Sequence, residues 1–147
     1  MHGLVEGLLL VTSNLARRSN VLALEESMRG VDDATDWAAG TTHHFADGVY
    51  TREVRRDADT AIVGKIHRYS CVNILLEGTL IIESEFESGT YTAPCVWTSP
   101  AGNKRAIYYL TNCRWMTVHK NPTNTQDLGE LESMLIAESY HALAAGG

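Results

Sequence analysis

The stretch of sequence from Gly64 to Arg105 decides the fold. It opens with GKIHRYSCVNILLEG at residues 64–78 and closes with APCVWTSPAGNKR at residues 93–105. Both parts contain short apolar segments bounded by glycine or proline, which is typical of short β-strands separated by turns. In a small β-barrel, the first part would point His67 and Asn73 inward.

Similar short segments continue on both sides of this stretch. Turns are predicted at Asp47-Gly48, Ser88-Gly89 and Pro100–Asn103, with a bend at Gly64. A hairpin turn is predicted at Glu77-Gly78, between the strands at 72–76 and 79–86. Strands are expected at residues 41–45, 49–54, 60–63, 72–76, 79–86, 95–98, 105–110 and 114–119, and the last two are expected to pair with each other. About eight short antiparallel strands at this spacing predict a mainly β fold, a single two-sheet jelly roll or closed barrel.

The motif residues of this stretch resemble those of the cupins, a family of small jelly-roll proteins. Cupins carry a His-x-His pair and a glutamate in a first motif, and Pro-x-Gly followed by a histidine in a second. Here His67 matches the first histidine and Pro100–Gly102 matches the turn, whereas Tyr69 and Arg105 stand where two other histidines are expected. Asn73 lies near the glutamate position. The resemblance implies a cupin-like jelly roll in which one of four metal ligands is clearly kept.

A narrower resemblance covers roughly residues 41–120. The segments HHFADGVYTRE at 43–53, GKIH at 64–67, SPAGNKR at 99–105 and WMTVH at 115–119 are similar, in this order, to small cupin-like proteins encoded by tailed bacteriophages. This resemblance implies a phage origin more firmly than it implies an activity.

Length and charge limit the possible functions. A chain of 147 residues suits one domain with one core. Its net charge of −6 argues against sequence-independent binding to DNA, which relies on lysine and arginine. The three cysteines, Cys71, Cys95 and Cys113, show no Cys-x-x-Cys spacing. We expect them to be small buried or half-buried strand residues, and the alternative is an intermolecular disulfide in an oxidising setting.

The N-terminal region, residues 1–40, lacks the short-strand pattern of the rest of the chain and is expected to form an arm. Its apolar run Leu4–Val11 is shorter than the roughly 20 residues that a membrane helix requires, so no membrane partner is expected. A short helix is predicted at Asn20–Met28, capped by Ser19 or Asn20 and followed by an acidic loop at 32–36. The arm is either a frayed terminus or a segment that becomes ordered against a neighbouring subunit.

The C-terminal region, residues 123–147, follows the predicted jelly-roll domain at 41–122. Between Asp127 and Leu143 the apolar period changes to that of a helix, with Leu128, Leu131 and Leu135 along one face. Thr125 is a candidate cap. This amphipathic helix is expected either to cover a sheet edge or to make a subunit contact.

The candidate metal ligands are His67, Asn73 and His119, with His43 or His44 as further donors. Arg105 cannot coordinate a cation, because its guanidinium stays protonated. It is expected to pair with a carboxylate, Glu53 or Glu77, or to bind an anionic ligand.

Two main hypotheses for the function follow. The first is a non-catalytic virion structural protein, a capsid decoration or cement protein without a cofactor. It would be assembled in the host cytoplasm, sit on the capsid surface, and contact the phage major capsid protein and itself as a homodimer or other homo-oligomer. The alternative is a small metal-binding cupin enzyme that acts on a small molecule and holds a divalent ion. A third hypothesis is a module that binds an anion through Arg105.

No catalytic residue is assigned, because the sequence contains no nucleophile elbow, phosphate-binding glycine loop or zinc-protease motif.

Overall fold

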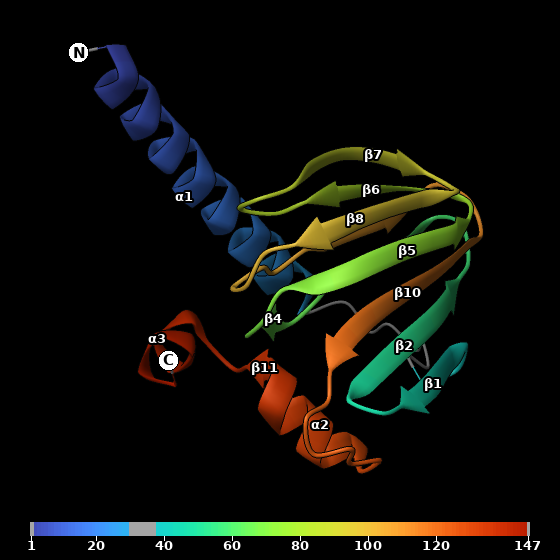
Figure 1. The fold of residues 1–147 in the computed structure, drawn as a ribbon. Coiled ribbons are helices and arrows are strands. Elements are labelled where there is room, and N and C mark those ends of the chain that lie inside the picture. Colours follow the sequence, from blue (N-terminus) through green and yellow to red (C-terminus); the bar gives the residue numbers. More distant parts are fainter. Residues whose placement is uncertain (1, 30–37, 147) are drawn as a thin grey trace.

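The structure is a computed structural model that describes residues 2–29 and 38–146, with the side chains of residues 15–29 and 38–146. Its elements are, in chain order, α1 (His2–Met28), β1 (Thr41–Ala46), β2 (Val49–Arg56), β3 (Thr60–Val63), β4 (Ile66–His67), β5 (Cys71–Glu77), β6 (Thr79–Glu83), β7 (Ser88–Thr92), β8 (Cys95–Ser99), β9 (Ala106–Tyr109), β10 (Cys113–Lys120), α2 (Leu128–Leu135), β11 (Ile136–Ala137) and α3 (Tyr140–Ala145) (Figure 1). Among these described residues, no helix is both long and apolar enough to cross a membrane.

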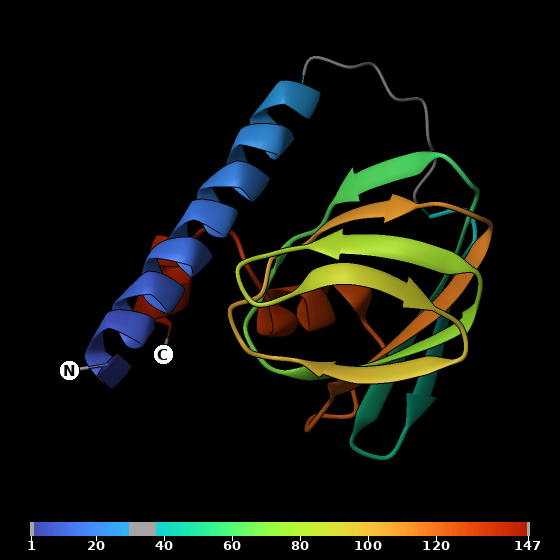
Figure 2. The same ribbon diagram turned by 90° about the horizontal axis from the view of Figure 1, so that it is seen from above.

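The strands form two main antiparallel sheets. The larger sheet has the order β1-β2-β10-β5-β8, and the smaller has the order β3-β9-β6-β7. Between these two sheets the chain crosses after β2, β3, β5, β7, β8 and β9, and the sheets curve around a common interior (Figure 2). This arrangement confirms the predicted jelly-roll fold.

Two predicted strand pairs are wrong. The turn at Gly78 is a corner and not a hairpin, because β5 and β6 belong to different sheets. Gly78 has a φ of 91°, and a side chain there would collide with the carbonyl oxygen of Asn112. Likewise, β9 pairs with β3 and β6, whereas β10 pairs with β2 and β5. A glycine turn is typical of both a hairpin and a corner, so the sequence pattern does not distinguish them.

The turn predicted at Ser88-Gly89 lies earlier in the chain, at residues 84–87. β6 ends at Glu83, and the amide of Ser84 donates to the carbonyl of Glu87 at 2.7 Å. The Ser84 hydroxyl also accepts from the amides of Phe86 and Glu87. These bonds close the turn before Ser88 and leave Gly89 within β7.

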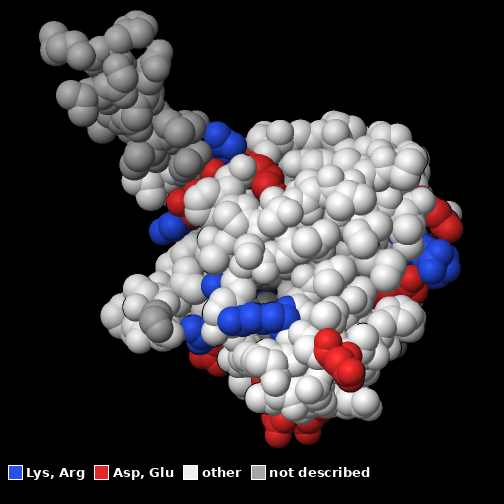
Figure 3. Space-filling model, viewed as in Figure 1, with Lys and Arg blue, Asp and Glu red and all other residues white. Residues whose placement is uncertain are grey.

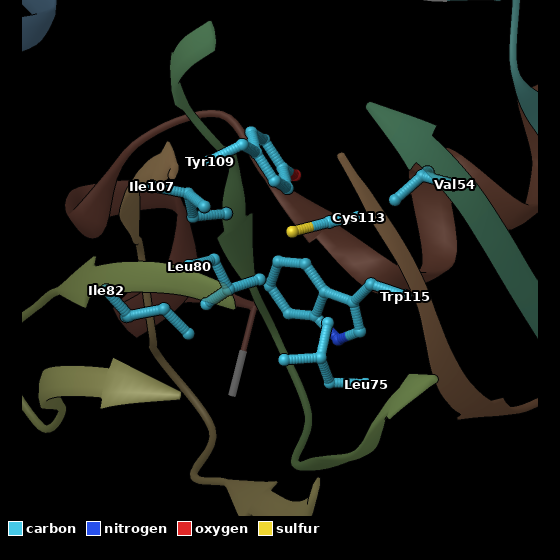
Figure 4. Packing of buried hydrophobic residues seen from close by; sticks show 8 residues of the cluster. All are labelled: Val54, Leu75, Leu80, Ile82, Ile107, Tyr109, Cys113 and Trp115. Carbon is cyan, nitrogen blue, oxygen red and sulfur yellow. The ribbon is translucent and has the colours of Figure 1, made fainter. Parts of the chain in front are cut away.

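The main core lies between the two sheets. Strand alternation turns eight buried residues toward each other, as Figure 4 shows: Val54, Leu75, Leu80, Ile82, Ile107, Tyr109, Cys113 and Trp115. Cys71 and Cys113 are buried and Cys95 is half-buried, as predicted. A smaller cluster joins Tyr50 of β2 to Leu131 and Leu135 of α2. The C-terminal segment therefore packs on the larger sheet next to the end of β10.

The single C-terminal helix predicted over Asp127–Leu143 is wrong. The segment contains α2, the two-residue strand β11 and α3. β11 pairs with β4, placing Ile136 opposite His67, and this extended pairing replaces the helical hydrogen bonds. Asp127 caps α2 in place of Thr125, by accepting from the amide of Glu130. Leu128, on the predicted apolar face, is exposed.

Helix α1 is much longer than the predicted Asn20–Met28, and Ser19 lies within it. Its C-terminal half packs against the jelly roll through the buried Val21. Two ion pairs add to this contact, between Arg18 and Glu85 at 2.8 Å and between Glu25 and Lys104 at 2.7 Å. The predicted acidic loop at 32–36 lies outside the described residues.

Candidate functional site

Three side chains with metal-binding atoms meet at the end of the jelly roll that the C-terminal segment covers. They are His67 of β4, Cys71 at the start of β5 and His119 of β10, and their ligand atoms all lie within 4.8 Å of one another. The Sγ atom of Cys71 is 4.0 Å from Nδ1 of His67, and the two imidazole centroids are 5.5 Å apart. Cys71 and His119 are buried, whereas His67 is half-buried. The cluster therefore has one partly open side.

The backbone around His67 is held from two directions. Its amide donates to the carbonyl of Asn103 at 3.0 Å, and its carbonyl accepts from the amide of Gly102 at 2.7 Å. On its other side, β4 pairs with β11, and the amide of Arg68 donates to the carbonyl of Leu135. The predicted Pro100–Asn103 turn and the C-terminal segment thus position this histidine together.

Both histidines are neutral at pH 7. Burial lowers the pKa of His67 well below its usual value, and the Arg105 charge lowers it further. Burial, followed by the charges of Arg105 and Arg52, lowers the pKa of His119 to about 4. Neutral imidazoles have the free lone pair that metal coordination requires. Burial raises the pKa of the Cys71 thiol, against an opposing effect of Arg105, so a metal would have to displace the thiol proton.

This donor set fits a divalent transition metal. Two imidazoles and a thiolate suit Zn²⁺ and similar borderline-soft ions. Three protein ligands also leave a coordination position for water or substrate, as in catalytic zinc sites.

Asn73, a predicted ligand, is fully buried near this cluster and has several hydrogen-bond partners. Its Oδ1 accepts from Nη1 of Arg105 at 2.8 Å, and its Nδ2 donates to Oγ of Ser99 at 2.9 Å and to the carbonyl of Trp97 at 3.3 Å. A metal-binding role for Asn73 stays a prediction. Cys71, which sequence reasoning had assigned to packing, completes the three-donor cluster.

The two N-terminal histidines lie outside the cluster. Nδ1 of His43 is 2.6 Å from the Tyr50 hydroxyl, and the Tyr50 ring stacks on His119 with centroids 5.9 Å apart. His43 is therefore connected to the site through Tyr50. His44 lies 3.9 Å from Glu53 and is exposed.

The predicted pairing of Arg105 with Glu53 or Glu77 is wrong. Glu53 accepts from Arg114 at 2.7 Å, and Glu77 lies 3.9 Å from Arg55. Arg105 instead donates from Nη1 to Asn73 and to Oγ of Ser99 at 3.1 Å, and its guanidinium lies 4.7 Å from the Trp115 ring centroid.

A buried carboxylate, Glu87, belongs to the same polar network. Its two oxygens accept from Oγ of Ser99 and from Nδ2 of Asn103, the latter at 3.2 Å. Ser99 therefore lies between Glu87 and Arg105, and links them without a direct ion pair.

Comparisons with known proteins return structures and no sequence family. No family model and no curated protein matches the chain. The chain is similar to a cupin-2 domain protein from Shewanella frigidimarina. The matched region is 54% of this chain and 80% of that protein, with 17% identity and a TM-score of 0.45. The putative ethanolamine utilization protein Q from Salmonella typhimurium covers 57% and 69%, with 20% identity and a TM-score of 0.48. KdgF from a Halomonas species covers 61% and 91%, with 13% identity and a TM-score of 0.47. The fold assignment rests on the strand order described above.

Proposed function

We propose that this protein binds a divalent transition-metal ion through His67, Cys71 and His119 and uses this site to bind and transform a small molecule. The observation that carries the proposal is the convergence of two neutral imidazoles and a thiol within 4.8 Å. Their convergence from β4, β5 and β10 is a feature that packing alone does not require.

A bound metal would supply Lewis acidity, by polarising a substrate oxygen or lowering the pKa of water. The chain's own residues prepare the site for such chemistry. The buried Tyr50 stacks on His119 and shields this side of the cluster from bulk water. The half-buried His67 marks the side from which a small molecule would approach.

Metal binding is tested by loading the purified protein with Zn²⁺ or Co²⁺ and measuring stoichiometry by native mass spectrometry and elemental analysis. One ion per chain is expected, with a thiolate-to-cobalt absorption band in the Co²⁺ form. His119→Ala and Cys71→Ser should lose the ion. His141→Ala, at an exposed histidine, and Cys95→Ser, at a cysteine outside the cluster, should keep it. Full metal occupancy in both Cys71→Ser and His119→Ala would refute the site.

A second candidate function is the capsid decoration role expected from the resemblance to phage proteins, with the major capsid protein and a second copy of this chain as partners. One feature that supports it is the outer face of the larger sheet, where Val72, Leu76 and Val96 are exposed. Figure 3 shows few charged side chains across this face. The test is co-sedimentation with assembled capsids, which Val96→Lys should weaken, since Val96 is 67% exposed. Undiminished binding by this variant would exclude this face as the capsid contact.

A further inference from the structure

We propose that the ligand of this site carries a carboxylate group, and that the guanidinium groups of Arg105 and Arg52 recognise it. The inference deepens the proposed function and rests on it for the location of the ligand. It names the class of small molecule, a carboxylate anion, and two residues that determine specificity.

Arg105 is a buried cation without a carboxylate beside it. Its exposed fraction is 6%, yet its hydrogen bonds go to the neutral acceptors Asn73 and Ser99. Among the described residues, no ion pair within 4.0 Å includes Arg105. The nearest carboxylate in its network, Glu87, uses its oxygens for Ser99 and Asn103. Taking a charge out of water without a counter-charge is costly, and an anionic ligand would offset this cost.

Arg52 adds a second cation on the same face of the larger sheet. It lies opposite Thr117 of β10, and Thr117 is on the same face of that strand as Trp115 and His119, because every second residue of a strand points the same way. Within the part of the chain that the structure describes, the guanidinium of Arg52 has no hydrogen bond or ion pair. Its side chain is exposed, so a ligand in solution can reach it.

Both guanidiniums lie against β10, the strand that carries His119. The Arg105 guanidinium lies 4.7 Å from the Trp115 ring centroid, and Arg52 pairs in register with Thr117, which lies between Trp115 and His119. A cationic, partly desolvated site of this kind discriminates against neutral ligands. A planar carboxylate matches a guanidinium because it accepts two parallel hydrogen bonds.

Succinate is the probe for this proposal, with succinamide as its neutral counterpart and inorganic phosphate as the alternative anion. Binding to the full chain is measured by titration calorimetry and by tryptophan fluorescence, since Trp115 lies beside Arg105. We expect saturable binding of succinate and none of succinamide. A charge-assisted hydrogen bond is worth about tenfold or more in affinity, so Arg52→Gln should raise the Kd for succinate by about that factor.

The matched control is Arg55→Gln. Arg55 lies on the same strand and its replacement changes the net charge equally, but it belongs to the opposite face and lies near Glu77. It should bind succinate like the unmodified protein. Arg105→Lys keeps the buried charge but loses the two-pronged geometry, and should also bind more weakly, with its fold verified by thermal unfolding. Equal losses in Arg52→Gln and Arg55→Gln, tighter binding of phosphate than of succinate, or no saturable succinate binding would each overturn the proposal.

Repeating the titrations on chelated and on Zn²⁺-loaded protein separates this inference from the proposed function. Stoichiometric metal without arginine-dependent succinate binding would refute the carboxylate inference and leave the metal site intact. Arginine-dependent succinate binding in a protein that takes up no metal would support the carboxylate inference and refute the metal-based function.

Discussion

His119 is a titratable group that the fold keeps neutral. Burial, followed by the charges of Arg105 and Arg52, lowers its pKa from 6.5 to about 4. In the unfolded chain the imidazole regains its ordinary pKa and takes up a proton at a higher pH. Between these two values the unfolded state binds more protons than the folded state, so the free energy of unfolding falls as the pH decreases.

The metal-free protein should therefore lose stability between about pH 6.5 and pH 4. The shift at His119 corresponds to a loss of about 3 kcal/mol across this window, and His67 contributes in the same direction. Urea unfolding at pH 7 and pH 4, with chelator present, measures this loss in the free energy of unfolding. His119→Asn should show a smaller loss than the unmodified protein, and the exposed His141→Asn should match the unmodified protein. Identical pH dependence in all three proteins would contradict this origin.

At the residue scale, the sequence predicts part of the candidate site. The sequence predicts His67 and His119 as ligands, because histidines at inward positions of strands are unusual. It does not predict Cys71 as a ligand, because a thiol among apolar residues is typical of core packing. The regular strand is interrupted between His67, where β4 ends, and Cys71, where β5 begins. Strand alternation therefore does not show that the two side chains face each other. The partners of Arg105 depend on which strands are neighbours, which the turn pattern did not reveal.

At the element scale, α2 and β11 connect the C-terminal region to the site. Leu131 and Leu135 pack on Tyr50, which stacks on His119, while β11 pairs with the strand that carries His67. The helical period of α2 was visible in the sequence. The break at Ile136 was not, because its cause is a pairing with β4, which is distant in the chain.

Leu131→Ala should therefore weaken both the fold and metal binding. Leu131 is 2% exposed, and removing a buried leucine side chain costs about 2–5 kcal/mol. Chemical denaturation and Zn²⁺ titration provide the two measurements. Leu128→Ala, at a position on the same helix that is 47% exposed, should cost less than about 1 kcal/mol and leave zinc affinity unchanged. Similar effects of the two substitutions would argue against the packing of α2 described here.

At the scale of the whole molecule, α1 is attached to the jelly roll by charges as well as by Val21. Lys104 is buried and lies 2.7 Å from Glu25. Arg18 donates two hydrogen bonds to Glu85 and lies over the Tyr140 ring. The arm expected at residues 1–40 therefore contains a helix that covers charged groups of the body. Whether it also contacts a neighbouring subunit stays a prediction.

Glu25→Gln should destabilise the protein, because it leaves the Lys104 ammonium without its carboxylate. Lost hydrogen bonds to charged groups cost about 1.5–3 kcal/mol, and partial exposure of Glu25 places the effect at the lower end. Glu26→Gln is the control, since among the described residues Glu26 forms an ion pair with the exposed Arg29 alone, and it should change stability by less than about 0.5 kcal/mol. Thermal and urea unfolding of both variants measure the difference. Unchanged stability of the Glu25→Gln variant would show that the Glu25–Lys104 pair does not help to hold the helix.

The pairing of β4 with β11 also has a consequence for biosynthesis. His67 and Cys71 leave the ribosome long before Ile136 and Ala137 are made, and at about 5–20 residues per second this delay lasts several seconds. During that interval the nascent chain has its thiol and first imidazole, but not the strand that holds them in place. The site is therefore complete only after β11 has been made and has paired with the strand that carries His67.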